Sequence, residues 1–218
     1  MEEVQSDQPF ESMHPDDIAE ALLESMPELD SLKSLSTPVI QRNTKSFKLL
    51  GDIQYPYTCY AVSGQSDRAC KLTAPSDLPA DIRGIYLIDY GLSNVYSTDA
   101  TLGVGVQACV YSHFGRSGTT TVSGMSAMRF NTTRPNTPNS QHNFGRAFDV
   151  KLQGRMKSNG AAYDQMACAY LCLYCVEAGA TKVFFSDQAV VDAVNKATGK
   201  SICSNIAGHE NHVHMDCR

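Results

Sequence analysis

The sequence lacks the two kinds of segment that direct a chain into or across a membrane. Its longest apolar runs contain only a handful of residues, whereas a membrane-spanning helix needs about 18 or more. The first residues, M-E-E-V-Q-S-D-Q, are acidic and contain neither the basic start nor the apolar stretch of a secretory signal. We therefore expect no membrane span, and a protein that is made in the cytoplasm and is not exported by a signal peptide.

The sequence also lacks the surface features of a nucleic-acid-binding protein. It contains no stripe of Lys and Arg and no platform of aromatic residues, so we expect no nucleic-acid partner. Its overall composition is ordinary for a globular protein. With 218 residues, 42% of them hydrophobic and 19% charged, it is long enough to bury a full core.

Charge is unevenly distributed along the chain. Residues 1–45 carry 10 acidic and 3 basic side chains, a net charge of −7, whereas residues 46–218 carry 13 acidic and 15 basic side chains, a net charge of +2. This difference predicts a mostly disordered acidic arm over 1–45, attached to a domain over 46–218. Residues 27–45, in which Ser, Thr, Pro and Asn are interspersed, are typical of a linker.

The arm is expected to contain one short amphipathic helix. Pro15 is suited to a first helical position, and the carboxylates that follow it face the positive end of the helix dipole. Apolar residues then recur at helical spacing, at Ile18, Leu22 and Met26. Pro27 is expected to end the run. The apolar face has two interpretations, packing on the protein's own domain or docking on a protein partner.

The eight cysteines include a C-x-x-x-C-x-x-C pattern at Cys168, Cys172 and Cys175. This spacing holds an iron–sulfur cluster in some enzymes, where it lies on a loop. Here it falls in an alanine- and leucine-rich helix predicted over 161–179 and ended by Gly179. The three thiols would share one helix face, which favours small core residues over a cluster. Further upstream, residues 101–114 fit either a helix or a buried strand.

Two short stretches carry the candidate site. S-Q-H-N-F-G-R-A-F-D at 140–149 supplies His142 and Asp149, and H-E-N-H-V-H-M-D at 209–216 supplies His214. Two imidazoles and one carboxylate are the ligand set of a catalytic Zn²⁺ that leaves its fourth position to water. Small Gly145 and Ala147 between the first two ligands let the backbone fold closely enough for both side chains to reach one point.

These stretches resemble a known superfamily. The pattern S-x-H-x-x-G-x-A-x-D followed by H-x-H is similar to that of zinc D-alanyl-D-alanine carboxypeptidases, L-alanyl-D-glutamate phage endolysins and the hedgehog signalling domain. Matching positions are Ser140, His142, Gly145, Ala147 and Asp149, then His212 and His214. The likeness extends over roughly 120–218. It implies an α+β fold in which a small antiparallel sheet with flanking helices surrounds one zinc site.

The resemblance also implies roles for individual residues. His142, Asp149 and His214 would bind the zinc ion, and His212 would lie beside the metal and stabilise negative charge. Glu210 would be the general base, although it stands four residues before the last histidine where the carboxypeptidases have three, so a turn at 208–211 is required.

Two further residues complete the implied site on the substrate side. Arg129 would bind a substrate carboxylate, because a planar guanidinium can donate two parallel hydrogen bonds to it. Ser140 would hold the loop and touch the substrate.

Two function classes follow. The first is a zinc peptidase that hydrolyses peptidoglycan stem peptides, and the expected absence of a signal peptide favours a phage-encoded or virion-associated enzyme that acts at the cell wall. The slightly positive charge of 46–218 suits an anionic wall polymer. The second is a zinc-stabilised binding or structural domain of the hedgehog kind without peptidase activity, in which the acidic arm contacts a protein partner.

Overall fold

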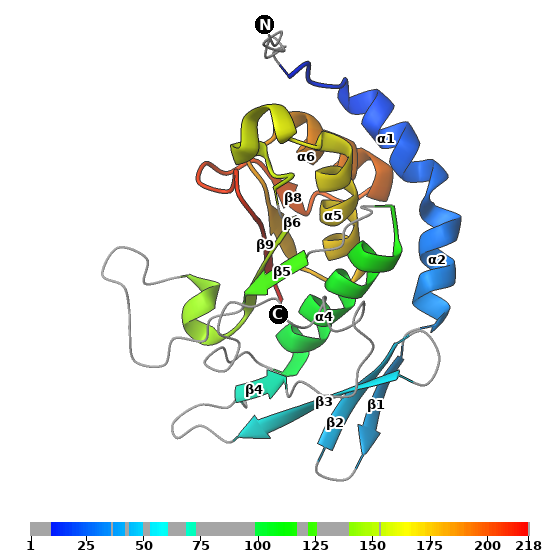
Figure 1. Cartoon of the computed structure of the whole chain (residues 1–218), viewed down its shortest axis with the longest axis vertical. Helices are drawn as coiled ribbons and strands as arrows, with labels where there is room; N and C mark the ends of the chain where they lie inside the picture. The colour runs from blue at the N-terminus through cyan, green and yellow to red at the C-terminus, as the bar shows by residue number, and fades with distance from the viewer. Residues whose placement is uncertain are drawn as a thin grey trace, which may run out of the picture.

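The computed structural model of the chain describes residues 10–35, 37–41, 44–49, 53–60, 69–72, 99–116, 122–125, 140–152 and 154–217. Helices and two sheets confirm the expected α+β class (Figure 1). Among the helices of these segments, none is both long and apolar enough to cross a bilayer.

The candidate site lies on the larger, five-stranded sheet. In spatial order its strands are β5 (Val122–Met125), β6 (Ala147–Leu152), β9 (Val213–Asp216), β7 (Lys182–Phe184) and β8 (Cys203–Ser204). All neighbouring strands are antiparallel except β7 and β8, which run parallel. The expectation of a purely antiparallel sheet is therefore wrong for this pair. The parallel pair arises because α6 (Gln188–Thr198) carries the chain across between β7 and β8.

Helices α4 (Asp99–Phe114) and α5 (Gln165–Glu177) cover this sheet. The run over 101–114 is thus a helix and not a buried strand. Eleven of the 13 residues of α5 are buried, as expected of a helix that is apolar on every side. The predicted start at residue 161 is wrong, because residues up to Ala162 form a separate 3₁₀ helix, η3 (Lys157–Ala162), and the Asp164 side chain caps the start of α5.

The three cysteines of the C-x-x-x-C-x-x-C pattern are core residues of α5. Cys168, Cys172 and Cys175 are free thiols with at most 1% of their surface exposed. Burial raises the pKa of each thiol above its usual value, because a thiolate would be poorly solvated there. All three belong to the hydrophobic core cluster, which confirms that they pack as core residues.

The N-terminal arm contains two helices where one was expected. Helix α1 (Pro15–Glu24) begins as predicted and ends at Ser25, whose backbone N–H bonds back to the Leu22 carbonyl. Helix α2 (Met26–Leu35) follows immediately. Pro27 does not stop the helical structure, because proline is tolerated in the first turn of a new helix.

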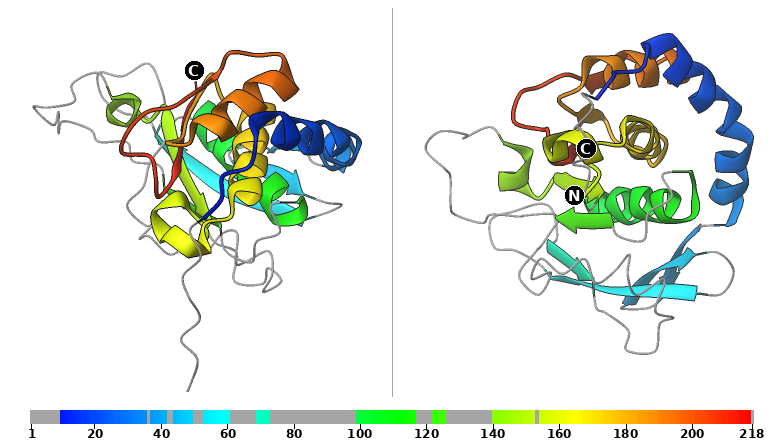
Figure 2. Two further views of the ribbon diagram at one scale, coloured as in Figure 1. Left: turned by 90° about the horizontal axis from the view of Figure 1, so that it is seen from above. Right: turned by 45° about the horizontal axis from the view of Figure 1, so that its top comes forward.

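Part of the arm belongs to the domain. α1 packs on α6, Ile18 and Leu22 are fully buried, and Leu29 of α2 joins the same core cluster. Figure 2 shows the two helices curving around one side of the molecule. The expected boundary at residue 45 also falls inside a strand, β2 (Thr44–Leu49). The apolar stripe of α1 is therefore covered by the protein's own domain, and the description of residues 10–35 as a disordered arm is wrong.

The smaller sheet is antiparallel and follows the arm directly. Its strands occur in chain order, namely β1 (Thr37–Gln41), β2, β3 (Ile53–Tyr60) and β4 (Ala69–Leu72). It lies at the end of the molecule next to α4 (Figure 1). Its register places Cys59 directly opposite Cys70.

Candidate metal centre

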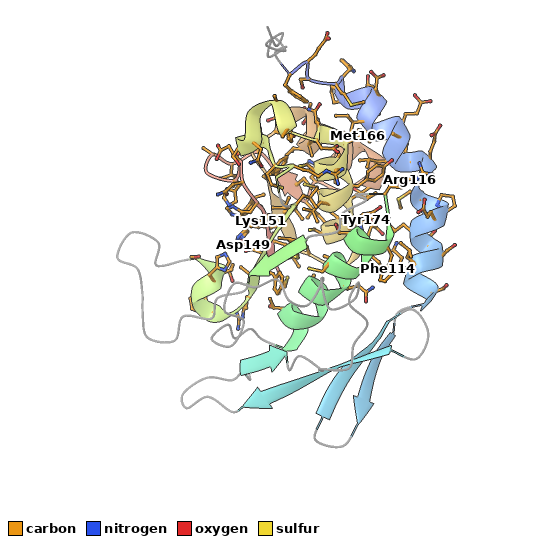
Figure 3. The ribbon with its side chains drawn as sticks, in the orientation of Figure 1. Phe114, Arg116, Asp149, Lys151, Met166 and Tyr174 are labelled. Carbon is orange, nitrogen blue, oxygen red and sulfur yellow. The ribbon has the colours of Figure 1, made fainter. Side chains whose placement is uncertain are left out.

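Three secondary-structure elements bring the predicted ligands together. His142 lies in a short 3₁₀ helix, η2 (Gln141–Phe144), Asp149 lies in β6 and His214 lies in β9. Asp149 and His214 are direct partners in the β6–β9 ladder, so their side chains emerge on the same face of the sheet. Figure 3 shows Asp149 at the β6 side of the sheet, beside η2.

The loop that carries His142 is closed by a glycine. η2 ends at Gly145, which has a φ of 66° in the left-handed region that favours glycine. The Gly145 N–H bonds to the His142 carbonyl, and the Arg146 N–H bonds to the Gln141 carbonyl. This tight turn reverses the chain into β6. It confirms that Gly145 lets His142 fold back toward Asp149.

The donor atoms of the three residues converge on one point. His142 Nε2 lies 3.1 Å from His214 Nδ1 and 3.2 Å from Asp149 Oδ1, and His214 Nδ1 lies 2.9 Å from Asp149 Oδ1. His214 is buried, and the other two side chains are largely covered. Of all His, Cys, Asp and Glu side chains in the described segments, these form the one group with the geometry to hold a metal ion.

The electrostatics of the group are those of a cation site. Burial by itself lowers the pKa of His214, but its hydrogen bonds with Asp149 and Asp216 outweigh burial and raise that pKa to about 9. Burial raises the pKa of Asp149, yet the hydrogen bonds from His142 and His214 hold it well below its usual range. The site therefore favours a carboxylate together with a positive charge, which a proton or a metal ion can supply.

His214 is contacted by two residues that the sequence did not identify for this role, one at its distal nitrogen and one on the face of its ring. Its Nε2 lies 3.0 Å from Asp216 Oδ1, and its ring stacks on Phe184 with an interplanar angle of 6°. The available signal for Asp216 was its position two residues after His214, which places both on one face of a strand.

His212 lies beside the three ligands, as the resemblance implies. It immediately precedes β9, and Val213, which follows it, is fully buried. His212 Nε2 is 3.8 Å from Asp149 Oδ1. Its Nδ1 lies 2.6 Å from the Asn211 side-chain oxygen and donates to it, so the lone pair of the neutral ring is on Nε2, which faces the ligands. Burial lowers the pKa of His212.

His209 is a third histidine at the site, and its position was not predicted. Its ring centroid lies 4.9 Å from that of His212 and 5.6 Å from that of His214. Its Nδ1 donates to the Ile206 carbonyl at 3.2 Å, and its backbone is bonded to Ser186. An H-x-x-H-x-H spacing is the signal in the sequence, but only the loop conformation brings the first ring back against the others.

Glu210 lies in the same loop with its carboxylate turned to the backbone. Its Oε1 accepts the Gly208 N–H at 3.2 Å. Backbone hydrogen bonds from Glu210 itself and from Gly208 lower its pKa. The chain turns at 207–208 and bends at 210–211. No hydrogen bond or ion pair joins Glu210 to the three ligands in the described part of the chain, and its role as base stays a prediction.

Two further predicted residues concern the substrate. Ser140 directly precedes η2, and its side chain makes no capping hydrogen bond to that helix. Arg129 lies outside the described residues.

One buried atom of the ligand set has no partner. His142 Nδ1 is inaccessible and unbonded within the described segments, whereas the distal nitrogen of His214 is bonded to Asp216. A hydrogen bond at the distal nitrogen therefore orients the His214 ring but not the His142 ring.

Comparisons of the chain with protein-family models, with curated proteins and with solved structures found no match.

Proposed function

We propose that this protein is a zinc-dependent peptidase that hydrolyses peptidoglycan stem peptides. The observation that carries the proposal is the convergence of His142 Nε2, Asp149 Oδ1 and His214 Nδ1 within 3.2 Å of one another. The class of substrate rests on the similarity of the two sequence stretches to zinc carboxypeptidases and endolysins of the cell wall.

The three donor atoms fit zinc. Zinc binds imidazole nitrogen and carboxylate oxygen at about 2.0–2.2 Å, so adjacent ligand atoms in a tetrahedral site are about 3.3 Å apart. The observed separations of 2.9, 3.1 and 3.2 Å are close to that value. Three protein ligands leave one position open, as in catalytic sites. A zinc ion bound there would lower the pKa of a water molecule to about 7 and polarise the scissile carbonyl.

In this proposal His212 transfers the proton, and His209 supports its ring. His212 Nε2 points at the ligand group with its lone pair free, so it accepts the proton of the attacking water. The resulting imidazolium stabilises the negative charge that develops on the carbonyl oxygen and then donates its proton to the leaving amine, which restores neutral His212. His209 packs against His212 and holds its ring in place. Glu210 takes the role of base only if its carboxylate leaves the Gly208 N–H.

Two residues named in the sequence comparison are the proposed substrate contacts. Arg129 binds a carboxylate of the stem peptide, and Ser140 contacts the peptide from the residue before η2. Two of the large hydrophobic residues that are exposed, Phe144 and Ile206, lie in the loops that carry His142 and His209. In the proposed peptidase these exposed side chains contact apolar groups of the peptide.

A second candidate is a zinc-stabilised domain without peptidase activity, like the hedgehog domain. The position of the Glu210 carboxylate on the loop backbone favours it, because the carboxypeptidases use a glutamate from this segment as their base.

Cleavage of defined stem peptides separates the two candidates. The zinc-loaded protein is incubated with cross-linked and uncross-linked stem peptides, and mass spectrometry of the products identifies the bond. His142→Ala and chelator-treated protein are the controls. Cleavage that is lost in both controls supports the peptidase. A wild-type protein that holds zinc and cleaves no stem peptide contradicts the peptidase and favours the structural domain.

A further inference from the structure

We infer that Asp216 is a positioning residue that fixes His214 as a metal ligand through its Nδ1 atom. The inference rests on the proposed metal centre and goes beyond it, because Asp216 is not itself a ligand. Its carboxylate lies on the far side of the imidazole, 3.0 Å from Nε2.

Asp216 is held firmly enough to act in this way. It is 4% exposed and lies in β9, the central strand of the five-stranded sheet. Its ladder partners are Ala147 on β6 and Lys182 on β7, and its carbonyl accepts hydrogen bonds from the backbone and hydroxyl of Thr181. Backbone pairing on both sides of β9, together with burial of the side chain, restricts how far the carboxylate can follow the imidazole if the ring turns.

The hydrogen bond decides which nitrogen of His214 is available to a metal. A carboxylate only accepts, so Nε2 donates its proton to Asp216 and the lone pair of the neutral ring resides on Nδ1. Nδ1 is the atom that faces His142 Nε2 and Asp149 Oδ1. The negative charge of Asp216 also makes Nδ1 more basic and therefore a stronger ligand.

Phe184 restricts the same ring in a second direction. Its ring stacks on the imidazole, at an angle of 6° and a centroid distance of 5.2 Å. The stacking sets the plane of the ring, and Asp216 sets its rotation within that plane. His142 has no comparable support, since its Nδ1 is unbonded within the segments that the structure describes. Asp216 is thus the carboxylate that preorganises this site from behind a ligand.

The competing explanation is that Asp216 only stabilises the fold. Zinc affinity distinguishes the two explanations, because a purely structural residue changes the free energy of unfolding and leaves the affinity of the folded protein unchanged. The matched control is Asp187→Asn. Asp187 is equally buried, caps α6 and accepts from the Tyr163 hydroxyl. In the described part of the chain, no hydrogen bond or ion pair joins it to the three ligands.

The experiment measures zinc dissociation constants of the full-length protein by competition with a chromophoric chelator. Asp216→Ala should weaken zinc binding by about 10- to 100-fold, the usual effect of removing such a carboxylate. Asp216→Asn should weaken it less, because the amide oxygen still accepts from Nε2, and it provides the test if the alanine variant does not fold. Asp187→Asn should bind zinc like the wild type.

Cobalt substitution gives a second readout that does not depend on activity. The visible absorption of the Co²⁺-loaded protein should shift in Asp216→Ala and remain unchanged in Asp187→Asn. If both Asp216 variants have the zinc affinity and the Co²⁺ spectrum of the wild type, the inference is wrong, but the proposed metal centre is not contradicted. A wild-type protein that binds neither metal would overturn the proposed metal centre and this inference together.

Discussion

Asp149 and His214 face each other across the antiparallel pair of β6 and β9, with Asp149 Oδ1 2.9 Å from His214 Nδ1. Their neighbours Val150 and Val213 are also paired, and both are fully buried on the opposite face. A slip of one residue in this register would expose the valines and bury the ligands, so the apolar core fixes the pairing. Two ligands from distant parts of the chain are thereby held together by the fold itself.

The purified protein should bind one zinc ion per chain, and His142→Ala should abolish this binding. His142 contributes one of three ligands, and two ligands hold zinc weakly. Elemental analysis after dialysis measures the metal content. His14→Ala is the control, because this exposed histidine caps α1 far along the chain from the ligands. Stoichiometric zinc in His142→Ala would mean that the metal binds elsewhere.

His212→Ala should lower the rate of stem-peptide hydrolysis by about 10²- to 10⁴-fold, the scale of a removed acid–base group, and leave the zinc content unchanged. Glu210→Gln should have a much smaller effect, because the Glu210 carboxylate is bonded to Gly208. Steady-state kinetics and elemental analysis of both variants provide the measurement. The reverse pattern, a large loss in Glu210→Gln alone, would assign the base to Glu210 as the sequence predicts.

The zinc-free protein should lose stability as pH rises from about 6 to about 10. The folded-state pKa of His214 is raised from 6.5 to about 9, so its contribution is fully present below pH 6.5 and is lost as pH rises through 9. A shift of this size corresponds to about 3 kcal/mol. Urea unfolding in the presence of a chelator measures it, and His214→Gln should show a flatter profile. Zinc affinity should rise over the same pH range, because the metal replaces the proton on Nδ1.

Leu22→Ala should destabilise the protein by about 2–5 kcal/mol, because its side chain is fully buried where α1 meets the core. Leu23→Ala is a matched control on the same helix, since Leu23 is 49% exposed and should change stability by less than about 0.5 kcal/mol. Chemical denaturation of the two variants gives the comparison. Equal stabilities would mean that α1 does not contribute to the folded domain in solution.

The candidate ligands and the local structure around them could be predicted from short-range sequence patterns. His142, Gly145 and Asp149 lie within eight consecutive residues, so a short-range pattern specifies both the donor types and the turn that joins them. The cysteine-bearing helix and the start of α1 were also predictable, because helical spacing and capping residues are local signals.

How distant segments of the chain meet was not predictable from local patterns, because it depends on surfaces that form only in the folded protein. Whether α1 is covered by α6 or left for a partner depends on a surface formed 170 residues later, and the one-dimensional charge difference suggested the wrong boundary. The placement of His209 against His212, and of Glu210 on the Gly208 N–H, depends on backbone dihedral angles in one loop. The burial of the Asp216 carboxylate beside His214 Nε2 likewise depends on the central position of β9 in the sheet.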